Sequence, residues 1–306
     1  MPGRGKYTRM RTVEPPTRGD VAAAAERIRP HLRPTPVVES DGFSLKLESL
    51  QPTGSFKVRG ALAALTALEP GTKVVTASAG NHGLAVAWAA ERLGFDATIV
   101  VAETASPAKI DGIRRFPATL VVHGLDYDAA ERHGLSLAGT YVSPYNDRQV
   151  IAGAGTVALE LGDVETIVVP IGGGGLASGI GIASGARVIG VVPEAFPAMR
   201  AALDAGRLVE IGGTDTVADG LHGNIEPGSV TFELVRDHVD DVVTVTEEEL
   251  LSAMLFLAFA HGLVVEGAGA AAVAAVRAGK AEAGVAIVTG RNIAPGRFDA
   301  VLHGRG

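Results

Sequence analysis

A lysine near the start of an expected helix is the first candidate for covalent chemistry. A strand is expected to run to Glu48, a turn follows at residues 52–54, and a helix begins near Phe56. Lys57 then lies in the first helical turn, where the helix dipole disfavours positive charge and lowers the pKa of an ammonium. A neutral lysine amine can react with carbonyl compounds. Since most lysines in such positions are surface residues, this pattern alone only suggests a nucleophile.

Two further segments place glycine where an expected strand gives way to a helix. Residues 78–83 read Ser-Ala-Gly-Asn-His-Gly, and their successive N–H groups could bind a carboxylate or simply cap a helix. Residues 172–175 are four consecutive glycines, which leave the backbone bare enough to surround a phosphate.

The glycine run does not identify the phosphate compound. Gly172, Gly174 and Ala177 also fit the dinucleotide pattern G-x-G-x-x-G/A, and Glu194 lies about where a ribose-binding acid belongs. The run therefore fits a nicotinamide enzyme as well as a pyridoxal-phosphate enzyme. A fourth segment, residues 288–292, follows another expected strand and offers the hydroxyl of Thr289 to a heterocyclic nitrogen.

The elements around these segments alternate between β-branched runs and alanine-rich helical stretches. The pattern predicts a mostly parallel α/β sheet with helices on both faces, whose ligands bind at the carboxyl ends of the strands. Asp20 is expected to cap a helix over 21–29, and Thr246 with Glu249 forms a capping box for a helix that stops at Gly262. The expected strands are 73–77, 97–101, 119–122, 166–170, 187–192 and 285–289, and the expected helices include 81–93, 153–161 and one from Gly175.

Composition narrows the class of protein. The 306 residues suggest one or two domains, and a formal net charge of −7 gives little electrostatic support for binding nucleic acid. No apolar run approaches a membrane span, no signal peptide is expected, and the sequence has no cysteine. The basic residues Arg4, Lys6, Arg9 and Arg11 are expected to form a solvated tail. A cytoplasmic protein follows as the expectation.

Taken together, the four segments resemble the threonine/serine dehydratases, which are fold-type II pyridoxal-phosphate enzymes. The most specific signature is Gly54-Ser-Phe-Lys-Val-Arg-Gly-Ala61, followed by Ser78-Ala-Gly-Asn-His-Gly83, and the similarity spans residues 34–293. The resemblance implies an α/β fold like that of the tryptophan synthase β chain, with two open, mostly parallel sheets. It implies a large domain (1–71 and 148–306), a small domain (72–147), ligand between them, and a homodimer.

The resemblance also assigns roles to individual residues. Lys57 would hold pyridoxal 5′-phosphate covalently and act as the catalytic base, with Phe56 packed beside it, and Asn81 would hydrogen-bond the 3′ oxygen of the cofactor. Thr289 would face the pyridine nitrogen, while Gly220 and Glu266 would line the ring. The implied phosphate loop is Gly172, Gly173, Gly174, Gly175 and Leu176, and the implied substrate-carboxylate loop is Ser78, Ala79, Gly80, Asn81 and His82.

The implied reaction is β-elimination from a β-hydroxy amino acid, L-threonine or L-serine, which yields a 2-keto acid and ammonia. A dehydratase for another substrate such as 3-hydroxyaspartate is an alternative, with Arg291 as the feature to test. A nicotinamide-dependent oxidoreductase and a non-catalytic amino-acid sensor are the alternatives of other classes. The sequence ends soon after Asn292, so we expect no C-terminal regulatory domain.

Three departures from the family pattern narrow the expectation. Ala79 stands where racemases of the family carry a serine that reprotonates Cα, so we expect little racemisation. Val192 stands where other members carry a carboxylate ligand, so we expect no metal at that position. Arg291 replaces a small residue and is expected to point either to solvent or to an acidic substrate group.

Overall fold

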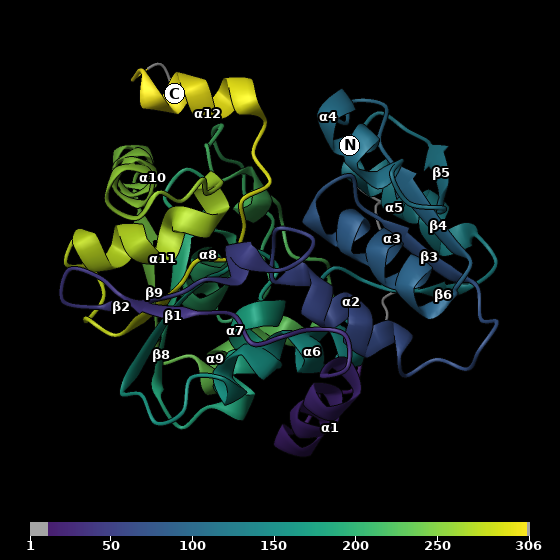
Figure 1. The fold of residues 1–306 in the computed structure, drawn as a ribbon, viewed down its shortest axis with the longest axis horizontal. Coiled ribbons are helices and arrows are strands. Elements are labelled where there is room, and N and C mark those ends of the chain that lie inside the picture. Colours follow the sequence, from purple (N-terminus) through teal and green to yellow (C-terminus); the bar gives the residue numbers. More distant parts are fainter. Residues whose placement is uncertain (1–11, 305–306) are drawn as a thin grey trace.

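A computed structural model describes residues 12–304, so the expected basic tail lies outside the described residues. The fold contains two sheets that lie side by side (Figure 1). The six-stranded sheet has the order β1 (Val37–Glu39), β2 (Ser44–Lys46), β10 (Val285–Ile287), β7 (Thr166–Pro170), β8 (Arg187–Pro193) and β9 (Asp241–Val245). The four-stranded sheet has the order β5 (Thr119–Val122), β4 (Ala97–Val101), β3 (Val74–Ala77) and β6 (Thr140–Tyr141).

Every neighbouring pair of strands is parallel except β1 and β2, which are antiparallel. The predicted α/β class with two mostly parallel sheets is therefore confirmed. The strands of the smaller sheet all fall between residues 74 and 141. The domain limits at residues 71/72 and 147/148 stay a prediction.

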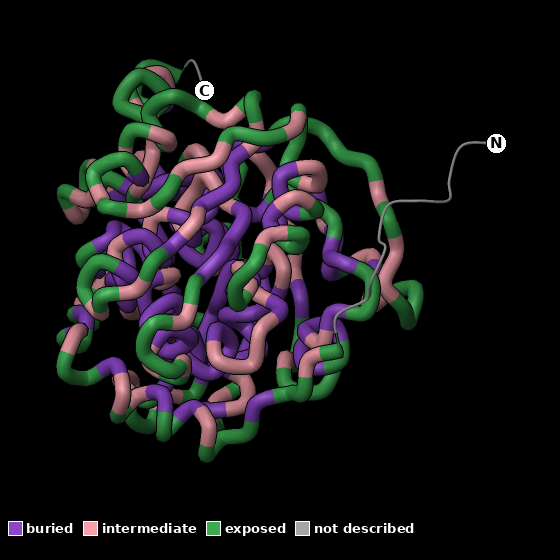
Figure 2. The backbone as a smooth tube through the Cα atoms, turned by 90° about the vertical axis from the view of Figure 1, so that its right-hand side faces the viewer, coloured by how far each residue is buried: buried purple, intermediate pink, exposed green. Residues whose placement is uncertain are grey.

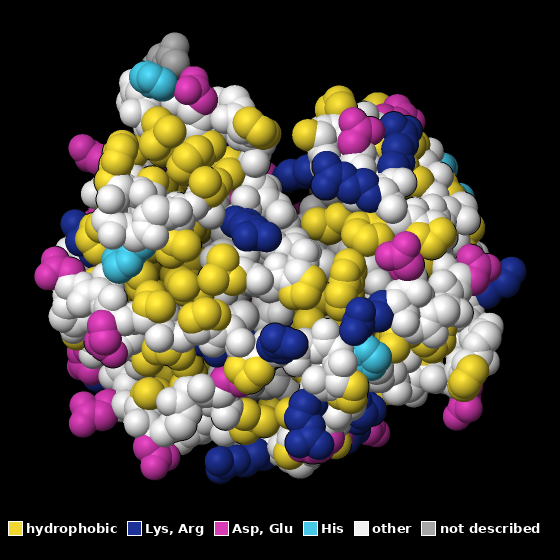
Figure 3. Space-filling view, viewed as in Figure 1, with side chains coloured by type: hydrophobic (Ala, Val, Ile, Leu, Met, Phe, Trp, Pro, Cys, Tyr) yellow, Lys and Arg dark blue, Asp and Glu magenta, His cyan; other side chains and the backbone are white. Residues whose placement is uncertain are grey.

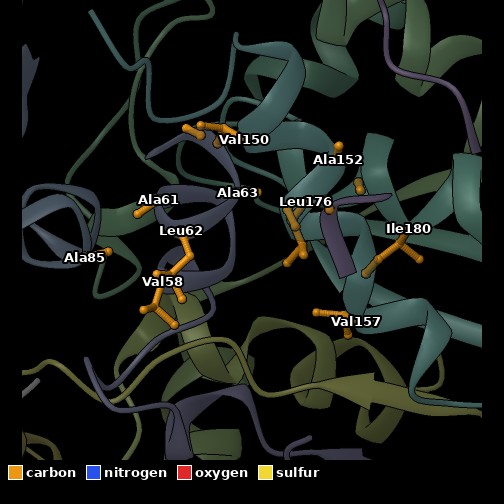
Figure 4. Packing of buried hydrophobic residues seen from close by; sticks show 14 of the residues in the cluster. Val58, Ala61, Leu62, Ala63, Ala85, Val150, Ala152, Val157, Leu176 and Ile180 are labelled. Carbon is orange, nitrogen blue, oxygen red and sulfur yellow. The ribbon is translucent and has the colours of Figure 1, made fainter. Parts of the chain in front are cut away.

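Helices cover both faces of the larger sheet because successive side chains of a strand point to opposite faces. On β7, Ile167 and Val169 belong to one buried cluster, whereas Val168 belongs to the other. The first cluster packs under α7 (Gly175–Ala183), α6 (Arg148–Leu159) and α2 (Lys57–Leu65), as Figure 4 shows for Val157, Leu176 and Ile180. The second packs under α11 (Gly267–Arg277) and α10 (Glu247–His261).

The smaller sheet is covered in the same way by α3 (Asn81–Leu93) on one face and α5 (Tyr127–Ser136) on the other. Helix α2 also packs against α3 and so connects the two halves of the fold. The remaining helices are α1 (Arg18–Ile28), α4 (Pro107–Ile113), α8 (Ala198–Ala205), α9 (Val230–His238) and α12 (Pro295–Leu302), with 3₁₀ turns η1 (Glu48–Leu50) and η2 (Asp219–Leu221). Figure 2 shows the buried backbone concentrated inside the molecule. No helix within residues 12–304 is long and apolar enough to cross a membrane.

Several predicted boundaries are wrong by a few residues. The cap of α1 is Thr17, and Asp20 completes its capping box from the N3 position instead of standing at the N-cap. Helix α6 begins at Arg148, not at 153, because the Asp147 carboxylate accepts from the N–H groups of two residues in the first turn. The strand expected to reach Glu48 ends at Lys46 and passes into η1, and β10 ends at Ile287. The capping box at Thr246 and the stop at Gly262 are confirmed.

A buried ionic cluster joins β2, η1, α2 and the end of α6. Arg59 is 1% exposed, and its guanidinium donates to the carboxylates of Glu48 and Glu160 at 2.7–2.8 Å. Lys46 is fully buried and donates to Glu160 at 2.5 Å and to the carbonyl of Thr35 at 2.8 Å. Two cations and two anions balance in charge, and each makes charge-assisted hydrogen bonds, as buried ions require.

We expect Arg59→Met to destabilise the protein by roughly 3–5 kcal/mol, because it leaves Glu48 and Glu160 with a single buried cation. Urea unfolding measures the loss. Arg187→Met is the matched control, since the Arg187–Glu282 pair is about half exposed and an exposed pair contributes roughly 0–1 kcal/mol. Equal losses for the two variants would contradict the role we assign to the cluster.

Candidate active site

Lys57 is the first residue of α2, as predicted, and its amine is held inside the molecule. The Lys57 Nζ donates to the carbonyl of Pro144 at 2.7 Å and lies 5.0 Å from the centre of the Phe56 ring. An antiparallel bridge between Ser55 and Gly290 fixes the preceding segment, and the Phe56 N–H donates to the carbonyl of Thr289 at 3.0 Å. Lys57, Phe56 and Thr289 are therefore brought together.

The electrostatics of Lys57 favour a reactive amine, although the main cause differs from the expected one. Burial lowers the pKa of Lys57 to about 8, and the carboxylate of Glu266 partly opposes that shift. The position of Lys57 in the sequence suggested the helix dipole as the cause. The main cause of the lowered pKa is instead desolvation, because the buried ammonium loses its hydration shell. About a tenth of the amine is then neutral at pH 7, far more than for an ordinary lysine.

The glycine loop forms the start of α7 and presents an unusual row of donors. Among the hydrogen bonds between described residues, none has as its donor the N–H of Gly172, Gly173, Gly174, Gly175 or Leu176. A Cβ on Gly173 would lie 2.3 Å from the ring of Tyr145, and Gly174 has a φ of +90°. Five adjacent N–H groups at a helix N-terminus fit an anion such as a phosphate.

The loop at residues 78–83 begins α3 and presents a second row of N–H groups. Within the described residues, the N–H groups of Ala79, Asn81 and His82 donate to no backbone or side-chain acceptor, whereas that of Gly80 donates to the Ser78 hydroxyl at 3.2 Å. The loop can therefore bind a carboxylate through its backbone. Gly83 permits the tight turn, because a Cβ there would lie 1.9 Å from the carbonyl oxygen of Ser78.

The side chain of His82 does not take part in this row. It is 2% exposed, and its Nε2 lies 3.1 Å from the carbonyl of Val142. Burial, with a smaller effect of the Lys57 charge, lowers the pKa of His82 to about 3. The ring is therefore neutral, and Nε2 carries the proton because a carbonyl can only accept. Only the backbone of His82 is available to a ligand.

The remaining predicted residues meet around Glu266. The Asn81 amide donates to the Glu266 carboxylate at 2.7 Å, and the Glu266 N–H donates to the carbonyl of Gly290 at 3.1 Å. A Cβ on Gly172 would lie 3.2 Å from the carbonyl of Gly220, so Gly220 lies beside the glycine loop. Thr289 is buried, and its hydroxyl makes only a long contact of 3.3 Å with the carbonyl of Ala268.

Burial raises the pKa of Glu266 to about 7, although the hydrogen bond from Asn81 and the charges of Lys109 and Lys57 lower it. The charge of Asp219 contributes to the rise. Glu266 and Lys57 thus interact with opposite charges, and each favours the ionised form of the other.

Three site residues escaped the sequence analysis. Pro144 accepts from Lys57, Tyr145 packs over Gly173, and Asn292 donates to Asn81 at 2.7 Å. Pro144 and Tyr145 lie in the segment between β6 and α6, which contains none of the sequence motifs. A main-chain carbonyl leaves no signature in a sequence, so the Pro144 contact had no signal.

The site lies between the two sheets. The part of the molecule around each sheet is called a lobe here. Figure 3 shows a hollow between the two lobes at the top of the view, with basic side chains along one wall. An ion pair of 2.7 Å joins Lys109 on α4 to Asp219 on η2, and so links the two lobes beside Gly220. Arg291 is exposed, and its side chain makes no described hydrogen bond or ion pair. Of its two expected placements, this one is the solvent-facing placement.

The residues present fit pyridoxal phosphate. The bare N–H groups of the glycine loop suit a phosphate, the depressed pKa of Lys57 suits covalent attachment through a neutral amine, and both contact the segment Pro144–Tyr145. The cofactor requires both an anion cradle and an amine. The arrangement meets both requirements within one site.

Comparisons with known proteins agree with this geometry. A sequence model of the family described as "Pyridoxal-phosphate dependent enzyme" matches residues 28–290. The L-threonine ammonia-lyase of Thermotoga maritima is 42% identical over 278 residues, which cover 85% of this chain and 69% of the relative.

Solved structures are similar as well. The T.th. threonine deaminase has a TM-score of 0.85 and 35% identity, covering 91% of this chain and 99% of the other. The serine racemase of maize has a TM-score of 0.87 and 29% identity, covering 95% and 98%.

We expect Gly173→Ala to weaken the binding of pyridoxal phosphate to the apoprotein by at least about tenfold, or about 1.4 kcal/mol. The added Cβ would lie 2.3 Å from the Tyr145 ring, so the loop and its N–H groups must shift. Titration of the cofactor by absorbance measures the Kd. Gly185→Ala is the control, because a Cβ there meets nothing within 4 Å; an unchanged Kd for Gly173→Ala would rule out the cradle.

The rate at which the apoprotein attaches pyridoxal phosphate covalently should rise with pH, with a midpoint near 8. Only the neutral Lys57 amine attacks, so the rate should fall about tenfold per pH unit below the midpoint. Stopped-flow absorbance measures it. Glu266→Gln should move the midpoint to lower pH, because the carboxylate raises the pKa of Lys57. A midpoint near that of an ordinary lysine would contradict the depressed pKa.

Proposed function

Since the chain belongs to the pyridoxal-phosphate dependent enzymes, we propose that it eliminates water from L-threonine and that the enamine so formed is hydrolysed to 2-oxobutanoate and ammonia. The family membership makes it a pyridoxal-phosphate enzyme, and its similarity to L-threonine ammonia-lyases makes it one of the ammonia-lyase type. The names of its relatives, L-threonine ammonia-lyase and threonine deaminase, support threonine as the substrate. L-serine is proposed as a second substrate, because its β-hydroxyl leaves by the same chemistry.

One observation carries the proposal. The Lys57 amine and the glycine loop contact the same two-residue segment, Pro144–Tyr145. An amine with a pKa of about 8 and five N–H groups that donate to no described residue therefore lie beside the same short segment. A nicotinamide enzyme has no use for that lysine, and an amino-acid sensor needs no reactive amine. The pair fits a lyase that holds its cofactor covalently.

The bound cofactor supplies an electron sink for the carbanion that forms when the substrate loses its Cα proton. In our proposal the Lys57 amine takes that proton as the general base, and its depressed pKa matches this task near neutral pH. The N–H groups of Ala79, Asn81 and His82 hold the substrate carboxylate. The N–H groups of the glycine loop hold the phosphate, with Gly220 and Glu266 along the ring.

Thr289 completes the proposed constellation. Its hydroxyl is neutral and is proposed to accept or donate one hydrogen bond at the pyridine nitrogen. A neutral partner does not stabilise a protonated nitrogen as a carboxylate would. The carbanion should then be short-lived, which favours prompt loss of the β-hydroxyl over slower reactions.

Racemisation is a second candidate, because the serine racemase of maize has a similar structure. It requires a proton donor on the face of Cα opposite Lys57. Ala79 occupies the position proposed for that donor and has no proton to give. We therefore propose elimination as the main reaction, with racemisation at most a minor one.

3-Hydroxyaspartate is the competing proposal for the substrate. The exposed guanidinium of Arg291 would have to turn into the site to bind the second carboxylate. Activity on 3-hydroxyaspartate that exceeds activity on threonine, and that is lost in Arg291→Ala, would support this alternative.

We further propose a cytoplasmic homodimer. Apolar side chains on and after α10 remain uncovered, among them Phe259 at 78% exposure and Val264 at 48%. A second copy would remove them from water. The cytoplasm is proposed because free amino acids and the cofactor occur there together. A monomer in analytical ultracentrifugation would contradict the dimer.

Purified holoenzyme should convert L-threonine to 2-oxobutanoate and ammonia, and Lys57→Ala should abolish the conversion. Keto-acid formation and chiral chromatography of the remaining amino acid measure both reactions. Accumulation of the D-enantiomer faster than keto acid would favour racemisation. Bound cofactor with no keto acid from threonine or serine would overturn the proposed substrate.

A further inference from the structure

The orientation of the Asn81 amide is fixed by Asn292, a residue to which the proposed mechanism assigns no role. The Nδ2 of Asn292 donates both to the Oδ1 of Asn81 at 2.7 Å and to the carbonyl of Thr53 at 2.8 Å. On its other side, the Nδ2 of Asn81 donates to the Glu266 carboxylate at 2.7 Å. Three side chains and one carbonyl thus form a chain of hydrogen bonds.

The carbonyl of Thr53 gives this chain its direction. A carbonyl can only accept, so Asn292 must turn its NH₂ group toward Thr53. Both hydrogens of that group are then used, and the one that faces Asn81 requires an oxygen there. Asn81 must present its oxygen to Asn292 and its NH₂ group to Glu266 and the site. Turning Asn81 around would place its NH₂ group against the NH₂ group of Asn292 and its oxygen against the Glu266 carboxylate.

Two glycines make room for the chain. A Cβ on Gly54 would lie 2.4 Å from the Oδ1 of Asn292, and a Cβ on Gly290 would lie 2.1 Å from the Oε1 of Glu266. The Arg291 N–H donates to the carbonyl of Gly54 at 2.9 Å, which ties Asn292 to the segment that carries Lys57. The chain therefore fixes Asn81, on α3, relative to the segment of the reactive lysine.

We propose that Asn292 is a positioning residue that fixes which end of the Asn81 amide faces the cofactor. This inference rests on the proposed contact between Asn81 and the 3′ oxygen of pyridoxal phosphate. One NH₂ hydrogen of Asn81 goes to Glu266, and the second has no described acceptor. That second hydrogen is the donor available to the cofactor oxygen, and an amide turned around would present an oxygen instead.

Glu266 cannot supply this orientation by itself over the working pH range. With a pKa of about 7 it exchanges its charge near neutrality, and a protonated carboxyl can donate as well as accept. The carbonyl of Thr53 does not titrate. The hydrogen bonds that Asn292 donates to Thr53 and Asn81 therefore keep the same direction below and above neutral pH.

The decisive variant is Asn292→Asp in the holoenzyme, titrated by the visible absorbance of the bound cofactor without substrate. A carboxylate only accepts, so Asn81 must turn its NH₂ group toward residue 292. The cofactor oxygen then loses a hydrogen-bond donor that favours its deprotonated form. The pH midpoint of the absorbance change should therefore rise. We expect a rise of about one pH unit, equivalent to about 1.4 kcal/mol. Asn292→Ala leaves the amide unfixed and should give a smaller rise.

Two further variants test whether the shift in the pH midpoint comes from charge or from the lost hydrogen-bond donor. Arg291→Gln changes the neighbouring charge by the same sign and amount as Asn292→Asp but leaves the chain intact, so its midpoint should stay unchanged. Asn81→Ala removes the donor itself and should raise the midpoint. If Asn81→Ala has no effect, the proposed contact of Asn81 fails, and the inference fails with it.

A shift in Asn81→Ala together with wild-type midpoints in Asn292→Asp and Asn292→Ala would overturn the role of Asn292 alone. An equal shift in Arg291→Gln and Asn292→Asp would do the same, because charge would then explain the effect. Should Asn292→Asp fail to fold, the neutral Asn292→Ala still decides, since an unchanged midpoint there contradicts the inference.

Discussion

The position of Lys57 depends on the buried ionic cluster of Lys46, Glu48, Arg59 and Glu160. Arg59 lies two residues beyond Lys57, and Glu48 precedes the turn before it, so the cluster fixes the segment on both sides of the reactive amine. Charges taken out of water are tolerable only when each is paired and hydrogen-bonded, as these four are. The ion pairs anchor the start of α2 to β2, η1 and the end of α6.

The anchored position of Lys57 affects the reactivity of its amine. The described hydrogen-bond partner of the Lys57 amine is the neutral carbonyl of Pro144, and no described carboxylate forms an ion pair with it. Burial therefore lowers its pKa to about 8, and Glu266 moderates the shift. The same packing that stabilises α2 produces an amine suited to attack and to proton transfer.

Close approach of backbone to side chains is the second constraint. Gly173 lets Tyr145 lie on the glycine loop, Gly290 admits the Glu266 carboxylate, and Gly54 admits Asn292. Each of these contacts is shorter than a Cβ would allow. These three glycines thus allow loops to converge at the carboxyl ends of strands, where ligands of open α/β folds bind.

The sequence by itself determined most of the elements and the family. The limits of β4, β5, β7 and α3 were predicted to the residue, because β-branched runs, glycines and helix starts are local signals. The resemblance in the Lys57 and Asn81 segments identified the family and its cofactor, which the glycine run alone left open between pyridoxal phosphate and a dinucleotide.

Only the tertiary structure decided how those segments meet. Asn81 contacts Glu266 across 185 residues and Asn292 across 211, and side-chain pairs so far apart have no local pattern. Likewise, the sequence placed His82 in the carboxylate loop but could not show that its ring turns away toward Val142. It attributed the low pKa of Lys57 to a helix dipole, whereas burial is the main cause. Burial is a property of everything packed around a residue, so it is set by the fold rather than by the neighbouring sequence.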